Sequence, residues 1–321
     1  MRRSAALLGL PLMMIVAGCA PAGSDPAAGP ASPASPDQRR EAFDQRATEV
    51  ADAWRPGPAW RTGYVPLQDH TVLVGDPRFT GDTKMAFNAG WYRDQIALPD
   101  TAPADGTVRF PDGTLSVPLI SADAAYRQLD QGDPPPCAGR PREPGRPKDG
   151  PTIEPGPDGP VSSTAQSACI PLTVTAAKLG SVPVRTSRGE AQVPAWLFTV
   201  EEISAPVARV AVAPGSVTAV PEVAPPSPSL DDDVAGAQDI RSVDGATLTW
   251  QVGVGSCDTG ITPLVWERDD VVVLGGGVTR STGVCNAMLK LEPVTATLKA
   301  PLGDRTVLDV VTGAPLTLTG G

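Results

Sequence analysis

The chain has 321 residues, among them 33 glycines and 37 prolines, and only 4% of its residues are aromatic. Its 26 basic and 36 acidic residues give a formal net charge of −10 at pH 7. An acidic chain lacks the electrostatic attraction to phosphate backbones, so nucleic-acid binding is disfavoured. The length is that of two modest domains joined by linkers.

Residues 1–18 have the features of a signal peptide. Arg2 and Arg3 precede a mostly apolar stretch, residues 5–16, that is shorter than the ~20 residues of a membrane-spanning helix. The stretch ends in Val16-Ala17-Gly18-Cys19, which resembles the lipobox of bacterial lipoprotein signal peptides. The resemblance implies cleavage before Cys19, lipidation of the Cys19 thiol, and a lipid anchor on the extracytoplasmic face of the cell membrane. An ordinary secretory signal with an incidental cysteine is the alternative.

The segment after Cys19 is expected to be a disordered tether, because residues 19–37 are mostly small residues and prolines. A helix is predicted over residues 37–54, where Phe43, Ala47 and Val50 recur at helical spacing. Acidic and basic residues share its other face, which favours packing against a core over binding to a membrane surface.

Residues 38–213 predict an α+β domain. Strand signals alternate with one short helix, and a loop rich in proline and glycine spans residues 132–160. The expected strands are 62–67, 71–74, a hairpin of 108–110 with 115–117, a pair 172–184 and 191–200 joined around residues 186–189, and 207–212; the expected helix is 121–130.

A proline-rich linker, residues 214–237, leads to a C-terminal segment with strand signals only. The expected strands are 246–254, 263–267, 271–274, 287–291, 294–299 and 305–311, with the glycines 275–277 read as a turn. Residues 238–321 therefore predict a small all-β domain, either a sandwich or a barrel. The fold class expected for the chain is mainly β with a few helices.

Four cysteines remain after Cys19, an even number in a chain expected to be exported. This predicts two disulfides in an oxidising compartment, and we favour Cys137–Cys169 and Cys257–Cys285 because a linker separates the two pairs. A zinc site is disfavoured because no Cys-x-x-Cys spacing is present.

Motifs for catalysis or cofactors are weak. His70 is the only histidine, and no Gly-x-Ser-x-Gly motif offers it a serine, so we interpret it as a turn residue after Asp69. The glycines 253 and 255 lack the third glycine of a dinucleotide loop, and no cofactor is expected.

Acidic and aromatic residues give the remaining candidates. Glu201 and Glu202, or Glu267 with Asp269 and Asp270, could serve a glycoside hydrolase if two of them faced each other. Asp231–Asp233 lacks the alternating spacing of a calcium loop, and no metal is expected. Trp196, Trp250 and Trp266 could form a carbohydrate platform, but tryptophans in strands are usually core.

The sequence therefore predicts a membrane-anchored extracytoplasmic lipoprotein. Beyond the lipobox, it resembles the many lipoproteins of GC-rich Gram-positive bacteria that have no assigned activity. The leading hypothesis is a non-catalytic binding or scaffolding protein of the cell envelope, with an envelope protein or glycan as partner. The alternatives are a carboxylate-dependent hydrolase of cell-wall glycans and a small-ligand binding protein.

Overall fold

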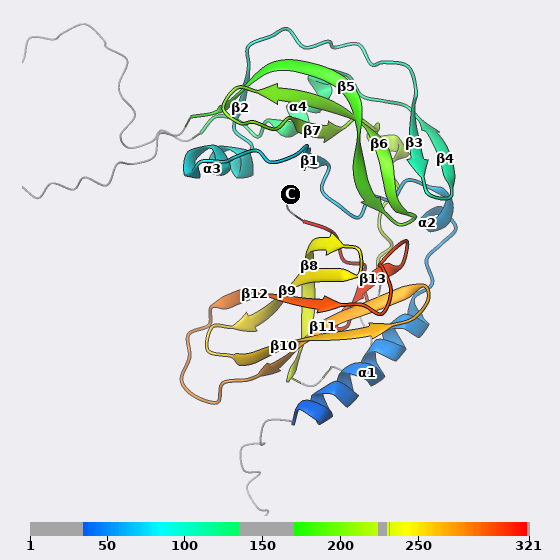
Figure 1. Cartoon of the computed structure of the whole chain (residues 1–321), viewed down its shortest axis with the longest axis vertical. Coiled ribbons are helices and arrows are strands. Elements are labelled where there is room, and N and C mark those ends of the chain that lie inside the picture. The colour runs from blue at the N-terminus through cyan, green and yellow to red at the C-terminus, as the bar shows by residue number, and fades with distance from the viewer. Residues whose placement is uncertain (1–34, 135–169, 224–229, 231, 320–321) are drawn as a thin grey trace, which may run out of the picture. The chain divides into compact units, whose positions relative to one another are not determined.

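A computed structural model describes residues 35–134, 170–223, 230 and 232–319 of the chain. These residues form a mainly β structure with two curled sheets and four α-helices, which confirms the expected fold class (Figure 1). Within these ranges no helix is long and apolar enough to span a bilayer. The lipobox residues 16–19, the tether up to residue 34, Cys137, Cys169 and most of the 132–160 loop lie outside the described residues.

The first sheet has seven strands and is organised around one long hairpin. Strands β5 (Leu172–Thr186) and β6 (Gly189–Val200) form the long antiparallel pair that the sequence predicts, with Val174 opposite Val200 at one end and Thr186 opposite Gly189 at the other. β6 also pairs with β7 (Val207–Val210) and with β3 (Gly106–Phe110), which forms the expected hairpin with β4 (Gly113–Val117). The short strands β1 (Thr71–Leu73) and β2 (Tyr92–Asp94) pair with β7 and β5.

Two helices accompany this sheet. Helix α4 (Ala122–Leu129) was expected, and the Ser121 hydroxyl accepts a hydrogen bond from the Ala124 amide at its start. Helix α3 (Gly81–Ala89) was not expected, although its ends carry ordinary signals. Thr80 and Thr83 form a capping box at its start, and Gly90 ends it with a φ of 67°.

The second sheet has six strands and packs against the N-terminal helix. Its strands are β8 (Val234–Asp244), β9 (Thr247–Gly255), β10 (Thr259–Glu267), β11 (Val271–Thr279), β12 (Leu289–Thr297) and β13 (Thr306–Asp309). The predicted N-terminal helix, α1 (Pro36–Ala53), packs against β11 of this sheet and buries Phe43, Ala47 and Val50 there. The division of the chain into separate domains stays a prediction.

Several expected boundaries were wrong. The linker expected up to residue 237 already contains the start of β8, where Val234 pairs with Gly277. The two strands expected at 287–291 and 294–299 are one strand, β12, paired with β9 along its length. In place of the strand expected at 62–67, the short helix α2 (Ala59–Thr62) is followed only by isolated bridges.

The glycine run at 275–277 is the most informative correction, because it lies within β11 and is not a turn. A Cβ at Gly276 would lie 2.6 Å from the Val252 side chain, and one at Gly275 would lie 2.8 Å from Val310. Each of these glycines therefore makes room for an apolar side chain of a neighbouring segment. Glycine here allows close packing, which sequence periodicity does not distinguish from a turn.

We expect Gly276→Ala to lower the free energy of unfolding by about 1–3 kcal/mol, because the added methyl group overlaps Val252 in a packed core. Urea unfolding followed by tryptophan fluorescence measures the change. Gly215→Ala is the control, since nothing lies within 4 Å of a Cβ at that position. Equal stability of the two variants would contradict the packing role of Gly276.

Candidate functional site

A solvent-open cavity of about 360 Å³ lies beside β1 in the first sheet. Strands β1, β2 and β7 and the C-terminal ends of α3 and α4 contribute to its wall. The residues that line it include Asp69, His70, Thr71, Tyr92, Gln128 and Arg209. We refer to it as the Arg209 cavity.

Strand pairing places Arg209 in the cavity wall. Arg209 lies directly opposite Thr71 in the β1–β7 register, and its Nη1 donates to Thr71 Oγ1 at 3.0 Å. Its Nε and Nη2 both donate to Gln128 Oε1 on α4, at 3.3 and 3.2 Å. Neither partner is charged, so these contacts orient the guanidinium without neutralising it. Burial is the largest cause of a lowered Arg209 pKa, and Asp69 opposes it electrostatically.

His70 lies next to this cation. Its carbonyl accepts a hydrogen bond from the Val210 amide at 2.9 Å, which fixes the residue just before β1. The pKa of His70 is lowered from 6.5, first by burial and then by the positive charge of Arg209, while Asp69 raises it. His70 is therefore mostly neutral at pH 7, and in that form one ring nitrogen can accept a hydrogen bond and the other can donate one.

Tyr92 adds an unusual feature to the wall. Its side chain is 3% exposed, and among the described residues its hydroxyl has no hydrogen-bond partner. Burial raises its pKa, so the hydroxyl is neutral. Close by, a Cβ at Gly90 would lie 2.5 Å from the Gln131 side chain, so glycine is required both by its positive φ and by this contact.

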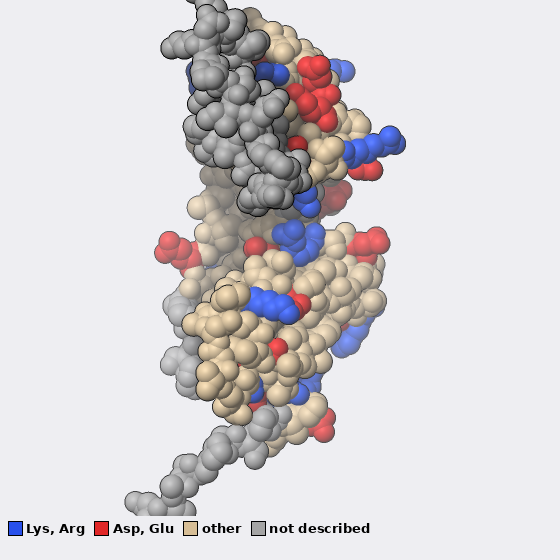
Figure 2. Space-filling model, turned by 90° about the vertical axis from the view of Figure 1, so that its left-hand side faces the viewer, with Lys and Arg blue, Asp and Glu red and all other residues tan. Residues whose placement is uncertain are grey.

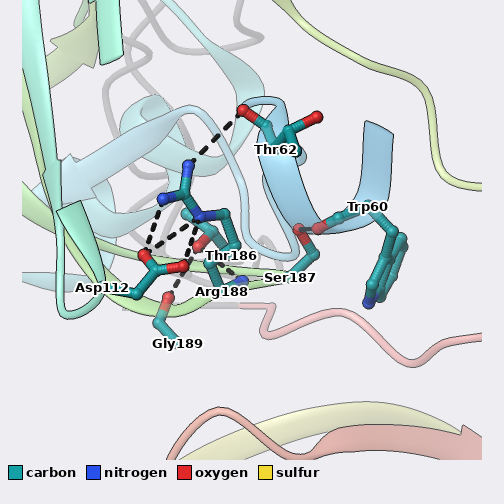
Figure 3. A network of polar contacts seen from close by, with 7 residues as sticks. All are labelled: Trp60, Thr62, Asp112, Thr186, Ser187, Arg188 and Gly189. Atoms are coloured by element: carbon teal, nitrogen blue, oxygen red, sulfur yellow. Dashed lines mark hydrogen bonds and ion pairs between the residues drawn. The ribbon is translucent and has the colours of Figure 1, made fainter. Parts of the chain in front are cut away.

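A second polar cluster lies at the turn of the β5–β6 hairpin (Figure 3). Arg188 donates to both oxygens of Asp112, with a shortest distance of 2.7 Å, and its guanidinium lies 3.8 Å from the centre of the Phe110 ring. Ser187 Oγ donates to the carbonyl of Trp60 at 2.6 Å. These groups bind one another, and the cluster therefore joins the hairpin to β3–β4 and α2.

The acidic residues proposed for hydrolysis lie in two separate places, and three of them have structural partners. Glu202 accepts from the amide and hydroxyl of Thr173 at 2.7 and 2.6 Å, beside the first sheet. Glu267 pairs with Arg305 at 2.8 Å and Asp270 with Arg268 at 2.7 Å, both in the second sheet. Glu201 and Asp269 are exposed, and none of the five lines the Arg209 cavity.

The other candidates have mainly structural surroundings. Trp196 and Trp250 are buried and donate to backbone carbonyls, and Trp266 is half-buried beside the α1 core. Cys257 and Cys285 form the expected disulfide. Asp231 lies outside the described residues, within which no cluster of potential metal ligands is found.

The sequence pointed to only part of this site. It singled out His70 and Asp69 but interpreted them as a turn, and it missed Tyr92, Gln128 and Arg209. An arginine at position 209 inside the apolar stretch 207–212 was an available signal, because a charged residue in such a strand needs a polar environment. Its partners lie far away in the sequence.

Comparison with protein-family models, with curated proteins and with solved structures finds no match for this chain. The site is therefore interpreted from its own geometry.

His70 gives a direct test of the cavity's electrostatics, because it is the chain's only histidine and its imidazole signals in NMR are unambiguous in tag-free protein. We expect it to titrate below 6.5. Arg209→Gln should raise this pKa part of the way, since the cation is removed while the burial remains. Because the pKa of His70 is lower in the folded state than in the unfolded chain, the unfolded chain takes up a proton more readily. The free energy of unfolding therefore decreases as the pH falls through and below 6.5.

Arg241→Gln is the matched control for the titration. It removes the same charge from an exposed residue of β8 whose guanidinium binds Thr319. An unshifted His70 in the wild-type protein, or equal pKa values in the wild-type and Arg209→Gln proteins, would contradict the proximity effect.

Proposed function

We propose that this protein is a lipid-anchored, extracytoplasmic binding protein whose Arg209 cavity takes a small polar ligand with a negatively charged group. The observation that carries the ligand proposal is the state of Arg209. Of the five N–H groups of a guanidinium, three donate to the neutral side chains of Thr71 and Gln128. Within the described residues, two N–H groups then remain to recognise a carboxylate or a phosphate, and the exposed Asp69 is the one acid that acts on the guanidinium charge.

The dimensions and polarity of the cavity support the same proposal. A volume of about 360 Å³ is within the range of small-molecule sites. Neutral His70 offers one donor and one acceptor, and Asn88 and Gln131 add amide groups to the lining. Asp69, the one acidic residue among the described residues of the lining, is exposed, so solvent screens its negative charge. Its repulsion of an anionic ligand is weaker than that of a buried carboxylate would be.

Binding is favoured over hydrolysis by the surroundings of the acids. Glu202, Glu267 and Asp270 each accept hydrogen bonds from their own structural partners, so none is available as a proton donor in the cavity. Hydrolysis of glycosides requires two carboxyl groups facing one bond. In the described part of the cavity wall, Asp69 is the one acidic residue.

The anchor rests on the lipobox residues Val16, Ala17, Gly18 and Cys19. The Cys257–Cys285 disulfide agrees with an oxidising compartment outside the cytoplasm. A chain with several acyl groups on Cys19 would stay on the membrane, because each buried CH₂ adds ~0.8 kcal/mol.

Ligand binding is tested by titrating purified mature protein with inorganic phosphate, with succinate and with glucose while the His70 imidazole signal is followed by NMR. We expect saturable shifts with at least one of the two anions and none with glucose. A bound anion beside Arg209 should also raise the His70 pKa. In Arg209→Gln the shifts should be lost, whereas Arg241→Gln should respond like the wild-type protein.

Absence of a saturable shift with either anion, or an unchanged response in Arg209→Gln, would contradict an anion site at Arg209. Thermal unfolding of each variant separates loss of the site from loss of the fold, because Arg209 also links α4 to β1.

Anchoring is tested by Cys19→Ala, which removes the thiol that would carry the lipid. We expect the variant to lack the mass of the acyl groups and to leave the membrane fraction, while Ala22→Ser, a change in the neighbouring tether, keeps both. Mass spectrometry of the intact protein and membrane sedimentation measure these outcomes. Membrane retention of Cys19→Ala would contradict lipidation.

A further inference from the structure

Exposed apolar side chains gather at one end of the second sheet. Four of the eight large apolar side chains that are exposed among the described residues fall within residues 284–291. Val284 and Met288 lie in the segment between β11 and β12, and Leu289 and Leu291 lie on β12. We call these four residues the apolar tip. Clustering of this kind marks an interaction surface, whereas single exposed apolar residues do not.

The segment that carries the tip is held in place. The Cys257–Cys285 disulfide ties it to the turn between β9 and β10. The Ser256 amide donates to the Met288 carbonyl at 3.0 Å, and the Ser281 amide donates to Asp258 at 3.1 Å. These contacts fix the backbone of the segment. The side chains of Val284, Leu289 and Met288 are fully or largely exposed, at 108%, 72% and 64%.

Two ion pairs lie next to the tip. Arg280 binds Asp258 at 2.7 Å, and Lys290 binds Glu292. In Figure 2, which faces the side of the second sheet with β12 and the preceding segment, most of the visible surface is uncharged. Little net charge therefore opposes transfer of the tip to an apolar environment.

The start of the described chain lies at the same end of this sheet. Arg39, in the first turn of α1, donates to Thr279 Oγ1 at 3.2 Å, and Thr279 is the last residue of β11 before the tip segment. Figure 1 shows the N-terminal end of α1 and the β11–β12 connection at this end. Fifteen residues separate Cys19 from Ser35. At ~3.1 Å per extended residue they span at most about 50 Å.

We propose that the apolar tip contacts the lipid bilayer to which Cys19 anchors the chain. This inference rests on the proposed lipidation. The anchor would keep the N-terminus of α1 within about 50 Å of the membrane. The tip lies at the same end of the sheet as that N-terminus, with its apolar side chains exposed. The anchor and the tip together give the second sheet two attachment points, which limit how it can rotate above the membrane.

Methionine oxidation tests this contact. Once the signal peptide is removed, the chain has two methionines, Met288 in the tip and Met85 on α3 in the first sheet, and both are exposed, at 64% and 48%. Lipidated mature protein is placed on vesicles of phosphatidylglycerol and phosphatidylcholine in equal parts, and then treated with hydrogen peroxide. Peptide mass spectrometry follows sulfoxide formation at each methionine.

We expect the oxidation rate of Met288 to fall several-fold on vesicles relative to the non-lipidated Cys19→Ala protein in solution, while the rate of Met85 stays the same. The double variant Leu289→Asp, Leu291→Asp should restore fast oxidation of Met288 on vesicles, because charged side chains do not enter the bilayer. The matched control Thr295→Asp, Thr297→Asp puts the same two charges on exposed positions further along β12 and should leave the protection intact.

Two results would overturn the proposal. One is that Met288 oxidises as fast on vesicles as in solution although the protein sediments with the vesicles. This result would agree with the lipid anchor and contradict the contact between the tip and the bilayer. The other is protection in solution that rises with protein concentration, which would assign the tip to a second copy of the chain. A protein that carries no lipid and does not sediment would instead contradict the proposed anchor.

Discussion

The β5–β6 hairpin is the constraint on which the first sheet and its cavity depend. Both strands are long, and every other strand of that sheet reaches them directly or through one neighbour. β7 is positioned by β6, and β7 in turn pairs with β1, so the pairing that sets Arg209 opposite Thr71 follows from the hairpin. The turn itself is closed by the Thr186 hydroxyl, which donates to the Gly189 carbonyl at 2.7 Å, with Gly189 at a φ of 87°.

The same hairpin reaches the second sheet through a buried arginine. Arg185, next to the turn, is 9% exposed and donates to the carbonyls of Gly303 and Arg305, both at 2.9 Å. Burial lowers its pKa to about 10, which leaves the guanidinium charged at neutral pH. Two carbonyl acceptors satisfy part of its hydrogen-bonding capacity, and losing them would leave buried N–H groups unsatisfied. The contact therefore fixes the segment that leads into β13.

The sequence predicted elements whose signals are local. Helix α1 was predicted to within a residue because its apolar side chains repeat at helical spacing, and both hairpins of the first sheet were predicted because strand signals flank turn residues. It failed where the meaning of a residue depends on a distant neighbour. In the sequence Gly276 indicates a turn, whereas in the structure it makes room for Val252. The role of Arg209 is not evident from the sequence, because its partners Thr71 and Gln128 come from β1 and α4.

The cavity places a cation beside a histidine, an arrangement that would couple proton binding to binding of the proposed anion. Arg209 lowers the pKa of His70, because two positive charges in a partly buried site repel each other. An anion that compensates Arg209 removes this repulsion, and protonation of His70 becomes easier. By linkage, protonation of His70 must then strengthen binding of the anion by the same factor. An anion site of this kind therefore binds more tightly as the pH falls towards the pKa of His70, as long as the anion keeps its charge.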